Sequence, residues 1–397
     1  MHVSRRLLLP LAASGLLALG ATALLPARVE QVARTVEQVR GRRFERPVPA
    51  SEIDPVELKR VLRSKIAEAF PASPEDTLKT LVALGLIDET PKLVDRLVDF
   101  YASQVIAFYD PEPRRFFVVR GMESALEKEG KSLEGMGGMA ERLIFAHELT
   151  HALQDESLKL DRRMKALKEN GDRALAIESL LEGEATVVMV RVAVADLPGA
   201  EEGAEEMLEP LLTAGALDRS SLPADIPDYF VEQLFFPYVE GTAYVRRMLK
   251  KGGWREVDRA WKNLPQSTSE ILHPEGAAFS PAADLLPSNA ERLSPAGARL
   301  LYADTIGEWS LRYLLRRTLE QPEADAAASG WRGDRIAFFS SGQGIAYLWR
   351  LQFESPGAAL RFESAWKKAH RKESLGRKGR EVLLSSGFEK VPDALGF

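Results

Sequence analysis

The feature that most constrains this chain is the stretch RLIFAHELTHALQDE at residues 142–156. Its two histidines, His147 and His151, are four residues apart, and Glu148 follows the first. Side chains four residues apart lie on one face of an α-helix, so the two imidazoles can bind one ion. Glu148 lies about 100° round the helix from His147, close enough to reach a water on that ion without binding the ion itself. The stretch therefore predicts a helix over 139–158 that buries one face and carries chemistry on the other.

This pattern needs a third ligand, because a catalytic zinc site takes three ligands from the protein and leaves a fourth position open. Without that ligand, the same letters describe an amphipathic helix with two hydrogen-bonded histidines. The best source is a second predicted helix, over 173–197, which contains the sequence ESLLEGEATVVM. Carboxylates inside such an apolar helix are costly unless they are paired, so they favour a metal site.

Within this second helix Glu182 best fits the third ligand, because its neighbours three and four positions away are small or polar. Glu184 is the alternative, since it lies about 200° round the helix from Glu182 and the two cannot face the same ion. Glu178, one turn earlier, is the candidate to orient a histidine ligand from behind. Gly183 costs about 1 kcal/mol in a helix interior and predicts close backbone approach to another element. Glu240, in a faintly similar Glu-Gly-Thr-Ala segment, is a weaker candidate ligand.

The composition of the chain argues against nucleic-acid binding and excludes every site that needs cysteine. The 397 residues are 45% hydrophobic and 28% charged, which is ample for a packed core. The formal net charge of −5 and the lack of a long basic block argue against nucleic-acid binding. There are no cysteines, which excludes disulfides, iron–sulfur clusters, cysteine nucleophiles and thiolate zinc sites. Any metal must therefore be bound through histidine and carboxylate side chains.

The start of the chain predicts export. Arg5 and Arg6 form a basic start, an apolar run covers 7–25, and the small residues Ala-Thr-Ala at 21–23 fit a signal-peptidase site. We expect residues 1–25 to be a signal peptide or an N-terminal membrane anchor. The predicted location is accordingly the periplasm, the extracellular space or the cell envelope, with membrane association through this segment if it is retained.

These residues also carry a resemblance to known enzymes. HELTH followed by a helix with LEGEAT resembles the gluzincin metallopeptidases, which hold zinc with H-E-x-x-H and a downstream glutamate. The resemblance implies one zinc ion, with His147, His151 and Glu182 as its ligands and Glu148 as the catalytic base. The segments VIAFYDPEPRRFFVV, PQSTSEILHPE and GWRGDRIAFF are also similar to segments of a largely uncharacterised family of secreted prokaryotic zincins.

The predicted fold class is α+β, with a predominantly helical zincin-like core, a small sheet and a C-terminal α+β subdomain that begins with a helix. Two apolar runs, 105–109 and 115–119, flank a proline-rich turn and predict a hairpin. An edge strand there would pair with an extended peptide. The expected divisions are an N-terminal helical region at 26–103, the catalytic core at 104–275, a linker at 276–298 and the subdomain at 299–397.

The predicted function is that of an exported zinc metallopeptidase acting on a peptide or protein substrate, with Glu148 as general base. A donor must also stabilise the negative charge that develops on the scissile carbonyl. His273 is the candidate for that donor, with Tyr238 and Tyr244 behind it. Two alternatives stay open: a non-catalytic cell-envelope protein that keeps a zincin fold for binding or assembly, and a metal-dependent amidase acting on cell-wall amides.

Overall fold

The computed structural model describes most of the chain after residue 20. The described residues are 21–121, 137–195, 223–275, 285–287, 290–295, 297–342, 344–369 and 373–390, with 392 and 395. Residues 1–20 of the predicted signal or anchor segment, and most of the predicted linker at 276–298, lie outside them. Within the described part, no helix is both long and apolar enough to cross a membrane.

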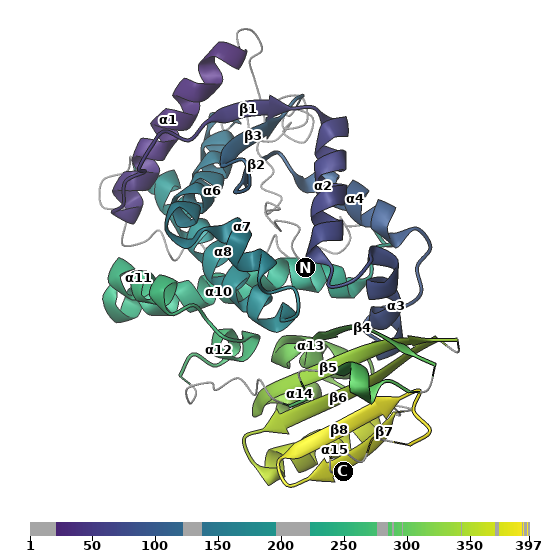
Figure 1. Ribbon diagram of the computed structural model, residues 1–397. Helices are drawn as coiled ribbons and strands as arrows, with labels where there is room; N and C mark the ends of the chain where they lie inside the picture. The colour runs from purple at the N-terminus through teal and green to yellow at the C-terminus, as the bar shows by residue number, and fades with distance from the viewer. Residues whose placement is uncertain are drawn as a thin grey trace.

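Helices form most of the chain up to residue 272 (Figure 1). In chain order they are α1 (Ala21–Arg40), α2 (Pro55–Ala69), α3 (Pro74–Leu84), α4 (Leu93–Gln104), α6 (Gly137–Leu158), α7 (Leu160–Lys165), α8 (Gly171–Val194), α10 (Asp228–Gly252), α11 (Trp254–Lys262) and α12 (Thr268–Leu272). The predicted helices at 139–158 and 173–197 are therefore α6 and α8.

A three-stranded sheet lies beside α6 and contains the predicted hairpin. Its strands are β1 (Ala50–Ile53), β2 (Ala107–Asp110) and β3 (Arg115–Val119), in the order β1-β3-β2. Strand β2 runs antiparallel to β3, while β1 pairs with β3 in parallel. The hairpin prediction is confirmed, and β2 is the edge strand that faces α6.

Helices α8 and α10 pack with their backbones in contact. A Cβ atom on Gly183 would lie 2.2 Å from the carbonyl carbon and oxygen of Gly241, and one on Gly241 would lie 2.0 Å from the carbonyl oxygen of Ser179. No side chain fits in either place, so only glycine permits this approach. The close approach predicted from Gly183 is confirmed, and Gly241, in the segment that resembles it, is the residue it meets.

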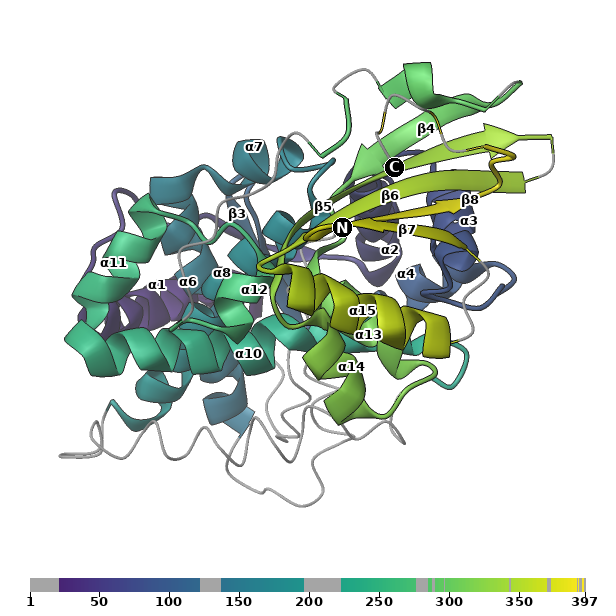
Figure 2. The ribbon, with the colours of Figure 1, turned by 90° about the horizontal axis from the view of Figure 1, so that it is seen from below.

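The C-terminal part is a five-stranded antiparallel sheet with helices on one face (Figure 2). Its strands follow the order β4-β5-β6-β8-β7. The elements are η2 (Ala290–Leu293), β4 (Arg299–Asp304), α13 (Gly307–Arg316), α14 (Gln321–Ala328), β5 (Trp331–Ser341), β6 (Gly344–Phe353), α15 (Pro356–Lys368), β7 (Ser374–Lys378) and β8 (Glu381–Ser386). Together with the helical part, this sheet confirms the predicted α+β class.

One expectation for this region is wrong, because the subdomain begins with strand β4 and not with a helix. The apolar run Leu300–Tyr302 suits either structure by its local pattern. Its pairing with β5, in which Leu300 lies opposite Phe339, decides for a strand. That partner lies far along the chain, so local periodicity gave no sign of it.

The N-terminus of α8 joins the helical part to the sheet part. The Asp304 carboxylate at the end of β4 accepts a hydrogen bond of 2.8 Å from the backbone N–H of Gly171. Asp172 Oδ1 accepts from the backbone N–H of Thr268 at 3.1 Å and from its hydroxyl at 2.5 Å. The backbone N–H of Trp309, in α13, donates in turn to the Thr268 hydroxyl at 3.1 Å. The junction is thus a network of polar groups around one helix end.

Candidate metal centre

Helix α6 places its two histidines inside the protein. The apolar residues Phe145, Leu149 and Leu153 belong to a buried cluster that also contains residues of α1 and α8. The side chains of His147 and His151 are only 2% and 1% exposed. Because polar side chains at that depth need partners, the position of these imidazoles depends on what faces them from α8.

Three side chains converge on one point between α6 and α8. His147 Nε2 lies 3.0 Å from Glu182 Oε2 and 3.1 Å from His151 Nε2. His151 Nε2 lies 3.3 Å from the same carboxylate oxygen. Zinc bonds of about 2.0–2.1 Å at tetrahedral angles place neighbouring ligand atoms about 3.3 Å apart. The three atoms are therefore spaced as the ligands of a single small cation would be, and together they form a group that can hold a metal ion.

The hydrogen-bond network fixes which nitrogen of His151 faces Glu182 and which faces Gln154. Gln154 Nε2 donates to the carbonyl oxygen of Leu181 at 3.0 Å and to Glu184 Oε2 at 2.9 Å. The amide oxygen of Gln154 must therefore face His151 Nδ1, which lies 2.8 Å away and has to be the donor. In the neutral imidazole, which is the form that binds a metal, the lone pair is then on Nε2, the nitrogen that lies 3.3 Å from Glu182 Oε2. A lone pair and a carboxylate oxygen both only accept, so the group that fits between them is a cation.

Glu184 does not face the two histidines. Its Oε1 accepts from the Arg40 guanidinium, and its Oε2 accepts from Trp261 Nε1 at 2.8 Å and from Gln154. The structure thus separates the two glutamates that the sequence left open: Glu182 joins the histidines, and Glu184 belongs to the polar network behind them.

Electrostatics keep the Glu182 carboxylate ionised. Burial by itself would raise its pKa, but the two imidazoles that face it act in the other direction. The charge of an imidazolium and hydrogen bonds donated by His151 and His147 hold the pKa of the Glu182 carboxyl below its usual range when no metal is bound. An ionised carboxylate is the form that binds a metal.

Glu148 follows His147 on α6, and its side chain is held by the edge strand. The backbone N–H of Tyr109, in β2, donates to Glu148 Oε2 at 2.9 Å. Tyr109 also donates its hydroxyl to Asp155 Oδ2 at 2.9 Å, so the same residue fixes β2 to α6 at two points. The strand and the acid expected to act on a substrate are therefore joined directly.

The three candidates for the carbonyl-stabilising donor lie in different surroundings. His273 Nε2 is 2.8 Å from Glu308 Oε1 and 3.0 Å from an Arg312 nitrogen, within the junction to the sheet part. Tyr238 instead stacks on His147, with ring centroids 6.0 Å apart and an angle of 24° between the rings. The pKa of Tyr244 is raised by burial and by the nearby Glu270 carboxylate. Of the three, Tyr238 is the one packed against a residue of the metal centre.

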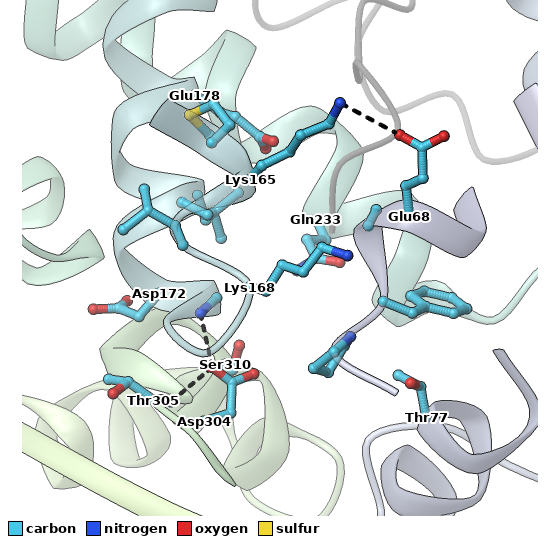
Figure 3. A pocket seen from close by; sticks show the side chains of 18 of the residues that line it. Glu68, Thr77, Lys165, Lys168, Asp172, Glu178, Gln233, Asp304, Thr305 and Ser310 are labelled. Atoms are coloured by element: carbon cyan, nitrogen blue, oxygen red, sulfur yellow. Dashed lines mark hydrogen bonds and ion pairs between the residues drawn. The ribbon is translucent and has the colours of Figure 1, made fainter. Parts of the chain in front are cut away.

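A cavity runs from the metal centre along α8 towards the sheet part, and both His151 and Glu182 line it. Figure 3 shows its walls: Glu178 comes from α8 and Lys168 from the turn before it, while Glu68 and Thr77 come from α2 and α3. Lys165 reaches across the opening to Glu68. Glu178, expected to orient a histidine, is a wall residue of this cavity, and the side chain bound to His151 Nδ1 is Gln154.

Three residues of this network, Gln154, Arg40 and Trp261, were not predicted from the sequence. Gln154 carried a usable signal, since it is a polar residue one turn after His151 on the same helix. Arg40 and Trp261 carried none, because each meets Glu184 only through long-range packing.

Comparison with known proteins adds little to this picture. Residues 298–395 match the model of a domain of unknown function, DUF8575, which covers the sheet part. No curated protein matches the chain. Among solved structures, a proposed hydrolase with a novel fold from Chloroflexus aurantiacus is similar to this chain. The similarity covers 65% of this chain and 90% of the Chloroflexus chain, with 18% identity and a TM-score of 0.39. Similarity at that level assigns neither a family nor an activity to this chain.

Proposed function

We propose that this protein is an exported zinc metallopeptidase that hydrolyses peptide bonds. The observation that carries the proposal is the convergence of His147 Nε2, His151 Nε2 and Glu182 Oε2, buried and spaced like ligands of one cation. Two imidazoles with a carboxylate and an open fourth position make a ligand set typical of catalytic zinc. When bound there, zinc would supply an activated water and polarise the scissile carbonyl.

Glu148 is the proposed proton carrier. It takes a proton from the attacking water and delivers it to the departing amine, so water adds across the C–N bond as that bond breaks. The hydrogen bond from the Tyr109 backbone holds one carboxylate oxygen in place. This restraint favours the geometry of proton transfer, which depends on a donor and acceptor held within about 3 Å.

Strand β2 is the proposed docking edge for the substrate backbone. It is an edge strand of its sheet, it lies against α6, and Tyr109 within it binds Glu148. An extended peptide paired with such an edge has its carbonyl groups presented at regular spacing beside the metal centre. Tyr238 is the proposed donor to the developing negative charge, on the strength of its stacking against His147.

The first test combines metal content with turnover. Protein purified without chelators should contain about one zinc per chain and should hydrolyse members of a peptide panel. In Glu148→Gln the Tyr109 N–H keeps an acceptor while proton transfer is lost, so zinc content should stay and hydrolysis should fall about 10²–10⁴-fold. Glu156→Gln, on the same helix, is the matched control and should retain activity.

Three results would count against this proposal in different ways. Absence of zinc, with none taken up on titration, would overturn the metal centre. Zinc without turnover on any peptide would favour the non-catalytic or cell-wall amidase alternatives. Full activity in Glu148→Gln would remove Glu148 from its proposed role.

A further inference from the structure

We propose that Arg40, the last residue of α1, is a positioning residue of the metal centre and acts on His151 through Glu184 and Gln154. The inference deepens the proposed function and rests on it, since it concerns how that centre is held. It links the first described helix of the chain to a ligand on α6, through contacts that are all buried.

The inner link is the amide of Gln154. Its oxygen faces His151 Nδ1 at 2.8 Å only as long as its nitrogen has acceptors elsewhere, at Leu181 and Glu184. If the amide turned over, its NH₂ group would face Nδ1, and the imidazole would have to move its proton to Nε2. That nitrogen could then no longer bind a metal. Outer partners of this kind commonly set the tautomer of a metal-binding histidine.

The middle link is the Glu184 carboxylate, which is completely buried. Three donors hold its two oxygens: Arg40 on one, Trp261 and Gln154 on the other. A buried carboxylate without a cation is strongly unfavourable. Loss of Arg40 would therefore release Glu184 from this position, and Gln154 would lose one of the two acceptors that hold its amide.

The outer link is the Arg40 guanidinium, which aromatic rings and a second carboxylate hold in place. Arg40 is 1% exposed, its guanidinium lies 4.5 Å from the ring centroid of Trp254 and 4.9 Å from that of Trp261, and a second nitrogen binds Asp258 at 2.6 Å. Aromatic faces on a guanidinium and a second carboxylate restrict its movement. These contacts hold the Arg40 guanidinium in one place, and the guanidinium in turn holds the Glu184 carboxylate that it binds.

A purely structural role for Arg40, attaching α1 to the core, predicts a loss of stability without any effect on His151. Arg42 provides the matched control for that role. It binds the same Asp258 at 3.1 Å and lies 4.6 Å over the same Trp261 ring, while the bond to Glu184 comes from Arg40. Arg42→Met should therefore weaken the attachment of α1 and leave His151 as it is.

The experiment measures two properties of the full-length protein and its Arg40→Met, Arg40→Lys, Arg42→Met and Gln154→Met variants. The first is zinc affinity by competition with a chelating dye. The second is the ¹⁵N NMR spectrum of His151 in the metal-free protein, assigned with His151→Gln, which reports whether the proton sits on Nδ1 or Nε2.

We expect zinc affinity to fall about 10–100-fold in Arg40→Met and Gln154→Met, the range usual for partners of metal ligands. The Nδ1–H signature should weaken in the same two variants. Arg40→Lys should recover part of both losses, and Arg42→Met should match the wild type in both.

Unchanged zinc affinity and unchanged His151 spectra in Arg40→Met would overturn the inference, as would equal losses in Arg42→Met. The NMR measurement needs no metal. If the wild type bound no zinc, the proposed function would fail, while the dependence of the His151 tautomer on Arg40 would still be decided.

Discussion

Helix α8 buries carboxylates at its middle and at its start. Nitrogen groups face the carboxylates at the middle, whereas other carboxylates lie near the one at the start. Around Glu182 and Glu184 the facing groups are imidazoles, a guanidinium, an indole N–H and an amide. Around Asp172 they are the hydroxyl and N–H of Thr268, with the carboxylates of Asp334 and Glu308 close by. The same helix therefore favours ionisation of Glu182 and disfavours ionisation of Asp172.

The pKa values follow these partners. The imidazoles lower the pKa of Glu182 although burial opposes ionisation. At Asp172 burial is the largest effect and the neighbouring acids add to it, so the pKa rises to about 8 despite the Thr268 hydrogen bonds. Burial alone thus does not distinguish a metal ligand from a structural acid, whereas the charge of the facing groups does.

The largest expected effect comes from removing the ligand at the middle of α8. Glu182→Gln should lower zinc affinity by more than about 100-fold, beyond the range usual for partners that do not touch the metal. Zinc content after dialysis is the measurement. Glu178→Gln, one turn earlier on the wall of the cavity, is the matched control and should keep the metal. Equal zinc content in Glu182→Gln and the wild type would show that Glu182 is not a ligand.

The next prediction concerns the backbone contact between Gly183, which follows Glu182, and Gly241. Gly183→Ala places a Cβ 2.2 Å from the Gly241 backbone, which must move, so the free energy of unfolding should fall by about 3 kcal/mol or more. Gly357→Ala, in the first turn of α15, meets nothing nearer than Ser355 Oγ at 3.8 Å and should be neutral or stabilising by up to about 1 kcal/mol. Denaturant unfolding measures both. Similar stability of the two variants would contradict the close packing of α8 on α10.

The effect that is smallest for each step in conditions concerns pH at the start of α8, where a change of one pH unit alters stability only slightly. Between the ordinary pKa of 3.8 and about 8, folded Asp172 keeps a proton that the unfolded chain has lost. Its contribution to stability is therefore greatest below about pH 4 and falls as the pH rises, by at most about 1.4 kcal/mol per pH unit, until it levels off above pH 8. Asp172→Asn should remove this part of the pH dependence.

Denaturant midpoints of the wild type and Asp172→Asn from pH 4.5 to pH 9 give the measurement, since their difference cancels the other titrating groups. The stability of Asp172→Asn relative to that of the wild type should increase as the pH rises. Parallel curves would mean that Asp172 titrates near its ordinary pKa and that its neighbours do not disfavour the charge.

Much of the helical framework could be predicted from local patterns. The starts of two helices illustrate this: Asp54 accepts from the Val56 N–H at 2.8 Å, and Ser267 Oγ accepts from the Glu270 N–H at 3.4 Å. Such caps involve neighbours two or three residues apart, so the sequence contains both partners. Strand β4 was missed because its partner β5 lies outside any local window.

The sequence by itself determined the helix with His147, His151 and Glu148, the candidates on α8, and the contact made by Gly183. These follow from helical spacing and from the steric size of glycine, both local properties. Only the tertiary structure decided that Glu182 meets the histidines while Glu184 meets Arg40, which lies 144 residues away. The local sequence favoured Glu182 but left Glu184 open, and their roles diverge because different elements pack against opposite sides of one helix.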